Sequence, residues 1–189
     1  MLNVSTNRSL YKQRGVNLTE LLIGIAIIAL LLAIAAPSMT SWLQNVQIRN
    51  AAETVQNGLQ QARVEAARRN VGVQFILGTG TSWRVGCVTV VADTDADGID
   101  ECPATIESRA AAEGSANVTV ATAQTTVVFN GLGRVTPVPA SDISFQFSNP
   151  VGGSCMPAGP MRCLRVVVTR GGQVRMCDPN HAAPDPRAC

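Results

Sequence analysis

Residues 14–36 read RGVNLTELLIGIAIIALLLAIAA, and this stretch decides how the chain is organised. The last sixteen of these residues are uninterrupted apolar. A helix over them would be roughly 24 Å long at about 1.5 Å per residue, which is close to the ~30 Å hydrocarbon core of a bilayer. Glu20 stands at the start of the apolar run, where inserting a carboxylate costs about 2.5–3.5 kcal/mol. The stretch therefore predicts a membrane helix whose single acid has a specific partner.

Three kinds of N-terminal segment share this pattern. A single-span anchor explains the apolar length and the basic residues that precede it, but it leaves the glutamate unexplained. A secretory signal peptide would be cut after Ala33-Ile34-Ala35, although its apolar region would be long and would begin with a charge. The third kind is cut between Gly15 and Val16, on the basic side of the apolar run, so that the helix stays on the mature protein.

The third alternative resembles the N-terminus of type IV pilins and pseudopilins. In that family the leader ends in glycine, a hydrophobic residue follows and glutamate is the fifth mature residue, as Gly15, Val16 and Glu20 are here. Pro37 falls where the family commonly carries proline, whereas Val16-Asn17 replaces the usual Phe-Thr. The resemblance implies cleavage by prepilin peptidase, N-methylation of Val16 and a helix kink at Pro37. It also implies that Glu20 pairs with the Val16 amine of a neighbouring subunit and sets the axial register.

The pattern remains helical after Pro37, to about Asn70. Apolar residues recur there at spacings of three and four and form one stripe, as expected for a helix lying on a core: Ile48, Ala51, Ala52, Val55, Leu59, Ala62 and Ala66.

Beyond Asn70 the apolar period changes to two, which indicates strands separated by Gly-rich or Pro-rich turns. The expected strands are Val71–Leu77, Trp83–Val91, Thr125–Phe129, Ile143–Phe147, Leu164–Thr169 and Gln173–Cys177. A long helix followed by strands predicts an α+β fold, in which the N-terminal helix packs on an antiparallel β-sheet as in the type IV pilin-like roll.

With the resemblance, this pattern implies four segments. They are a leader peptide at 1–15, a transmembrane helix at 16–38, an amphipathic helix at 39–70 that continues into the globular domain, and a periplasmic antiparallel β domain with disulfides at 71–189. The expected location is the inner membrane, crossed once with the C-terminal domain in the periplasm, and the pilus fibre after assembly.

Six cysteines all lie after the apolar segment, and no two of them form a C-x-x-C pair, so a zinc site is not expected. An even number beyond an export signal indicates disulfides formed in an oxidising compartment. Pairing in sequence order is one of fifteen connectivities, and the sequence leaves the choice open. The disulfide candidates are Cys87, Cys102, Cys155, Cys163, Cys177 and Cys189.

Two further segments narrow the resemblance to the GspH/FimT/FimU subgroup. Trp83–Cys87 followed by Asp93–Asp100 resembles a tryptophan, glycine and aspartate pattern of that subgroup, and Val128–Arg134 resembles its F-x-x-x-G-x strand. The resemblance implies a minor pilin that primes pilus assembly and lies at or near the tip. The alternatives are a DNA-binding competence pilin and a type II secretion pseudopilin. The implied partners are other minor pilins and the major pilin through helix 16–70, prepilin peptidase and the inner-membrane assembly platform.

The DNA alternative depends on arginines in the C-terminal half. Without residues 1–15 the chain has twelve arginines, no lysine and thirteen acids. Some FimT-type pilins bind DNA through a G-R-x-R motif, which corresponds here to Gly172–Arg175 with Gln173 in place of the first arginine. Scattered surface arginines without a role are the other interpretation. The candidate DNA contacts are Arg162, Arg165, Arg170 and Arg175.

Metal binding and catalysis have little support in the sequence. Asp93, Asp95 and Asp97 match the first ligand positions of a calcium loop, but Ala104 stands where a bidentate glutamate is needed. An acidic turn is therefore the favoured interpretation. The single histidine, His181, has no nucleophile motif near it. We expect no cofactor and no enzymatic activity.

Overall fold

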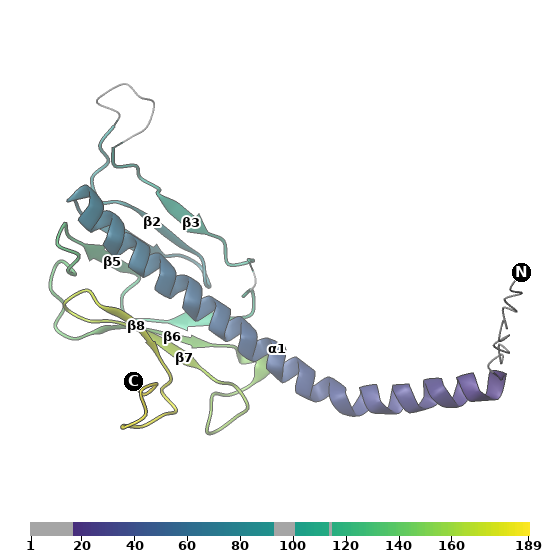
Figure 1. The fold of residues 1–189 in the computed structure, drawn as a ribbon. Helices are drawn as coiled ribbons and strands as arrows, with labels where there is room; N and C mark the ends of the chain where they lie inside the picture. Colours follow the sequence, from purple (N-terminus) through teal and green to yellow (C-terminus); the bar gives the residue numbers. More distant parts are fainter. Residues whose placement is uncertain (1–16, 93–100, 114) are drawn as a thin grey trace, which may run out of the picture. The chain divides into compact units, whose positions relative to one another are not determined.

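The computed structural model describes residues 17–92, 101–113 and 115–189 (Figure 1). The chain divides into two compact units, one ending at Met39 and the other comprising Thr40–Cys189. Its elements are a helix α1 (Leu18–Arg69), a short 3-10 turn η1 (Pro150–Gly152) and the strands β1 (Val73–Leu77), β2 (Trp83–Cys87), β3 (Glu107–Arg109), β4 (Thr119–Ala121), β5 (Thr126–Phe129), β6 (Ile143–Ser148), β7 (Leu164–Val168) and β8 (Val174–Cys177).

In the N-terminal unit, the helix presents its apolar side chains outward. From Leu18 to Ile34, its leucine and isoleucine side chains are 54–73% exposed. In the described part of the chain no single helix is both long and apolar enough to cross a bilayer, whereas Leu18–Ile34 and Met39–Arg69 pass that test as a bent pair. The transmembrane segment 16–38 and the kink at Pro37 stay predictions.

In the C-terminal unit, α1 packs on the core through the predicted stripe. All seven residues of the stripe are fully buried, which confirms the helical periodicity found in the sequence. Four of the seven are alanines, so the helix backbone can approach the sheets closely. Gly58 gives the closest approach, since a Cβ there would lie 3.0 Å from Phe75 Cε2 and 3.0 Å from Trp83 Cε3.

The strands form two antiparallel sheets, ordered β3-β2-β1-β5 and β4-β6-β7-β8, and α1 crosses both (Figure 1). Alternate residues of β1 and β6 point into one buried cluster that also contains the helix stripe. Phe75 of β1 contacts Phe145 of β6 edge to face, with ring centroids 6.0 Å apart, so this pair connects the sheets. The α+β fold is confirmed, with the predicted sheet divided in two.

The predicted strand positions are largely correct, but two strands were missed. Strand β2 ends at Cys87 instead of Val91; Val88 N–H still bonds to the Gly72 carbonyl, and Val91 forms only an isolated bridge with Cys102. Strands β3 and β4 have three residues each and hardly any buried side chains. Their sequences therefore carry no apolar alternation that could have predicted them.

Three disulfides cross-link the C-terminal unit. They pair Cys87 with Cys102, Cys155 with Cys163 and Cys177 with Cys189, at Cα–Cα separations of 5.7, 5.5 and 5.1 Å. Each bond joins consecutive cysteines, which is the sequence-order connectivity. Cys87–Cys102 connects the end of β2 to the segment before β3, and both of its residues are buried.

Replacing Gly58 with valine is expected to destabilise the domain by about 1–3 kcal/mol, because the added carbons overlap two packed rings that contact each other. Urea unfolding with the disulfides intact measures this. Gly171→Ala is the matched control, since its Cβ would meet only Thr169 Oγ1 at 3.9 Å. Equal stabilities of the two variants would contradict the close packing at Gly58.

Replacing Cys87 and Cys102 together with alanine is expected to lower the free energy of unfolding by about 3 kcal/mol, because a loop of 15 residues loses its covalent closure in the unfolded chain. Urea unfolding of the double variant beside the unchanged chain tests this. An unchanged midpoint and slope would show that the bond contributes nothing to stability.

Candidate functional site

Glu20 lies in the first turn of α1 and is exposed among apolar side chains. It forms no ion pair with any residue that the structure describes. One turn further on, apart from the local helix backbone and the adjacent residues, no described atom lies within 4 Å of a Cβ built at Gly24. The predicted cleavage site at Gly15 and Val16 lies outside the described residues. Glu20 is thus an exposed acid without an ion-pair partner among the residues that the structure describes.

The C-terminal end of α1 is tied to the first disulfide. Glu65 accepts hydrogen bonds from Arg68 at 2.7 Å and Arg69 at 2.8 Å, and Arg69 also donates to the Glu101 carbonyl, next to Cys102. Burial raises the pKa of Glu65, but the two guanidinium groups together lower it further, so the net shift is downward. The carboxylate therefore holds both arginines at the helix end at neutral pH.

The calcium candidates Asp93, Asp95 and Asp97 lie outside the described residues. Within the residues that can be inspected, no three His, Cys, Asp or Glu side chains form a group able to hold a metal ion.

The C-terminal tail folds back along β8. Asp178 N–H donates to the Arg187 carbonyl at 2.7 Å, and His181 lies between the carboxylates of Asp178 and Asp185 at 3.5 and 3.1 Å. The Arg187 side chain and backbone N–H hold the pKa of Asp185 well below its usual range. With the Cys177–Cys189 bond, these contacts give the tail a fixed path. His181 is thus a structural partner of two acids.

The four predicted DNA contacts do not share one surface. Arg165 and Arg175 lie on the same face of their sheet, since Arg165 is opposite Cys177 and Arg175 is opposite Val167. Arg165 is half-buried, and its Nε has no hydrogen-bond partner in the described chain. Arg175 donates to the Ala188 and Cys189 carbonyls at 3.2 Å each.

The other two arginines lie elsewhere. Arg170 lies in the connection between β7 and β8 and donates a hydrogen bond to the Ala140 carbonyl. Arg162 precedes β7, is exposed, and lines a groove on the helix side of the sheet. The predicted DNA surface is therefore reduced to Arg165 and Arg175, of which Arg175 already supports the tail.

The glycine of the G-R-x-R-like segment has a structural role of its own. Gly172 has a φ of +85°, and a Cβ there would lie 2.1 Å from the Gly133 carbonyl oxygen. That carbonyl also accepts a hydrogen bond from Arg63 Nε at 3.2 Å. The packing of this turn against the Gly133 carbonyl therefore explains why glycine stands at position 172, without a role in ligand binding.

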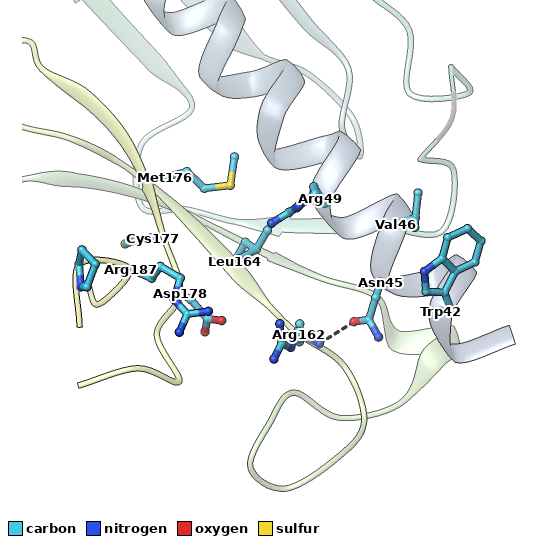
Figure 2. Close-up of a pocket in the computed structure, with 11 residues that line it drawn as sticks. Trp42, Asn45, Val46, Arg49, Arg162, Leu164, Met176, Cys177, Asp178 and Arg187 are labelled. Carbon is cyan, nitrogen blue, oxygen red and sulfur yellow. Dashed lines mark hydrogen bonds between the residues drawn. The ribbon is translucent and has the colours of Figure 1, made fainter. Parts of the chain in front are cut away.

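The groove that contains Arg162 has a volume of about 430 Å³. We call it the Trp42–Arg162 groove. Figure 2 shows one wall formed by α1, the other by the segment before β7 and by the C-terminal tail, and a hydrogen bond of 2.7 Å from Arg162 N–H to Asn45 Oδ1. Its lining residues are Trp42, Asn45, Val46, Arg49, Arg162, Leu164, Met176, Cys177, Asp178, Pro186 and Arg187.

The sequence does not reveal this groove, although one of its walls leaves a pattern in it. Trp42, Asn45, Val46 and Arg49 recur at spacings of three and four and so share one helix face, beside the buried stripe. The opposite wall comes from residues more than a hundred positions later, which no helical pattern could have indicated.

Comparisons with known proteins agree with this architecture. FimU, a type IV minor pilin of Pseudomonas aeruginosa, superposes with a TM-score of 0.53 at 16% identity, covering 76% of this chain and 97% of FimU. A second crystal form of FimU gives 0.50 at 16% identity, with 72% and 97% covered. The minor pseudopilin EpsH from the Type 2 Secretion System of Vibrio cholerae gives 0.48 at 12% identity, with 71% and 99% covered. At these identities the FimU likeness shows a shared fold.

A search of curated proteins finds no significant match. The model of the family described as Type II transport protein GspH matches residues 51–172, which include α1 from Ala51 to its end, strands β1 to β7 and the groove wall before β7. That match covers more than half of the chain, so this protein belongs to the GspH family, the minor pilins and pseudopilins of type IV pili and type II secretion systems.

Proposed function

We propose that this chain is a minor pilin that primes the assembly of type IV pili and is incorporated at or near the tip. Prepilin peptidase cuts the chain between Gly15 and Val16, and the mature protein is held in the inner membrane by residues 16–38 until it is assembled. Its role is structural, as it is for the family.

The observation that carries the proposal is the exposed apolar surface of α1 from Leu18 to Ile34. Monomeric soluble proteins rarely expose contiguous apolar patches larger than a few hundred Å². A bilayer covers such a helix before assembly, and the helices of neighbouring subunits cover it in a filament. The globular unit has its own buried core, so it remains folded in both settings.

Glu20 gives this surface its specificity. Leaving one charge of a buried pair without its partner costs about 3–5 kcal/mol. Cleavage would create a free amine on Val16, and the Val16 amine of the next subunit would satisfy Glu20 at one axial offset. Pairing of these two groups therefore selects the register in which subunits stack.

A type II secretion pseudopilin is the second candidate, because the matching family is named for that system. The helix and Glu20 would act in the same way in both systems. Deleting the gene distinguishes them: loss of surface pili with normal secretion supports the minor pilin, and loss of secretion with normal piliation supports the pseudopilin.

DNA binding is a third candidate, favoured by Arg165 and Arg175 on one sheet face.

Glu20→Gln is expected to reduce incorporation into sheared pili at least tenfold while leaving leader cleavage intact, because the Val16 amine of the next subunit loses its charged partner. Immunoblots of sheared pili and of membranes measure both quantities. Glu53→Gln is the matched control, since Glu53 is an exposed acid of the same helix whose contact with Arg49 is 3.9 Å long. Wild-type incorporation of Glu20→Gln would rule out the register role.

If the chain binds DNA, affinity for duplex DNA is expected to fall about tenfold between 50 and 200 mM salt, as for two phosphate contacts. Arg165→Ala and Arg175→Ala should each weaken binding, and Arg134→Ala should not. Fluorescence anisotropy with the full chain in neutral detergent measures this. No binding at low salt would remove the DNA candidate.

A further inference from the structure

We propose that the Trp42–Arg162 groove binds an acidic peptide segment, carrying an adjacent apolar side chain, from a neighbouring pilin subunit. This inference rests on the proposed function, because it requires a neighbouring subunit. The proposed pairing through the apolar surface Leu18–Ile34 and the Glu20 contact do not involve the groove, which lies entirely within the unit Thr40–Cys189.

The charges of the groove favour an anion. Arg162 is exposed, and its guanidinium makes no ion pair or hydrogen bond with a described residue. Arg49 faces the same cavity and has only the long contact with Glu53, in which its side chain remains 69% exposed. Asp178 and Arg187 also line the cavity, but both are already paired within the tail. Arg49 and Arg162 are thus two available cations on opposite walls (Figure 2).

The groove is also pre-organised for a carboxylate. Asn45 fixes the backbone of Arg162 by accepting its N–H at 2.7 Å and by donating to the Pro160 carbonyl at 3.4 Å. The Arg162 side chain takes no part in these bonds. Planar guanidinium groups bind carboxylates through two parallel hydrogen bonds, so less freedom is lost on binding than for a lysine.

The floor of the groove is apolar, so a ligand that covers it needs an apolar side chain next to its acidic one. Val46, Leu164 and Met176 line it and are half-buried, while Trp42 is 59% exposed at one end. A volume of about 430 Å³ is within the range of sites that take a small ligand or a few side chains. An acidic residue flanked by leucine or phenylalanine would satisfy the two arginines and cover the apolar floor together.

A lipid headgroup fits this site less well than a peptide. Trp42 alone would suit the membrane interface. Arg49, however, lies ten residues beyond Met39, which is about 15 Å along a helix. The headgroup layer on each side of a bilayer is only about 5–8 Å thick. A phosphate in that layer would not reach both Trp42 and Arg49.

DNA fits less well too, because the floor is apolar and the Asp178 carboxylate lines the wall. A phosphate backbone would leave the apolar surface uncovered and would be repelled by the acid. The groove therefore favours a ligand of mixed chemistry.

The fluorescence of Trp42 reports on occupancy directly, because Trp42 lines the groove and Trp83 is buried in the core. The full chain in neutral detergent is titrated with a short synthetic peptide of alternating glutamate and leucine. Parallel titrations use the same peptide with glutamine for glutamate, vesicles containing phosphatidylglycerol, and a DNA duplex. We expect a saturable change with the acidic peptide alone.

Arg162→Ala is expected to weaken peptide binding about tenfold or more, as for the loss of a charge-assisted hydrogen bond. This variant keeps the backbone bond to Asn45, so the fold is preserved. Arg49→Ala should have a similar effect. Arg134→Ala is the matched control, since Arg134 is exposed and does not line the groove.

Three outcomes would overturn the proposal: equal binding of the glutamine peptide, unchanged affinity in both groove variants, or a response only to anionic vesicles or DNA. A pilus assay separates this result from the proposed function. If Arg162→Glu assembles normally while Glu20→Gln does not, the groove proposal fails and the minor pilin proposal stands. If deleting the gene leaves piliation unchanged, the minor pilin proposal itself fails.

Discussion

The close contact between the second half of α1 and the two sheets is the constraint on which the rest of the structure depends. Ala51, Ala52, Ala62 and Ala66 are fully buried along that contact, and Gly58 lies against two aromatic rings. Small residues allow the helix to pack close to both sheets at once, so Phe75 and Phe145 can meet beneath it. A chain with only four phenylalanines, two tryptophans and one tyrosine obtains its core in this way.

The two halves of α1 differ in whether the chain itself buries their apolar side chains. The half in Thr40–Cys189 buries its stripe within its own domain, whereas the side chains from Leu18 to Ile34 remain exposed in the single chain. Some charges of the domain are paired within it, at Glu65 with two arginines and at Asp185 with Arg187. Among the exposed arginines, Arg49 and Arg162 lie in the Trp42–Arg162 groove, which combines available charge with apolar surface.

Sequence reasoning succeeded where a regular period carried the information. The helix stripe and the apolar strands have such periods. The cysteines pair in sequence order, but the sequence left that choice open among fifteen connectivities. It failed for β3 and β4, which lack buried alternation, and for the division of the strands into two sheets. It also grouped Arg162 with Arg165 and Arg175, because the sequence places Arg162 before the strand but does not show that it lines a groove beside the helix. The groove depends on contacts between distant segments, such as Asn45 with Arg162, and these leave no local pattern.

The order of the disulfides has a consequence for export. The bonds close spans of 15, 8 and 12 residues, and none encloses another. When the chain enters an oxidising compartment from its N-terminal end, the cysteine that follows Cys87, Cys155 or Cys177 is therefore its native partner. An enzyme that oxidises cysteines in order of arrival forms the correct set, with no need for one that reshuffles wrong pairs. In the proposed minor pilin, whose domain is exported, all three cross-links can thus form as the chain is translocated.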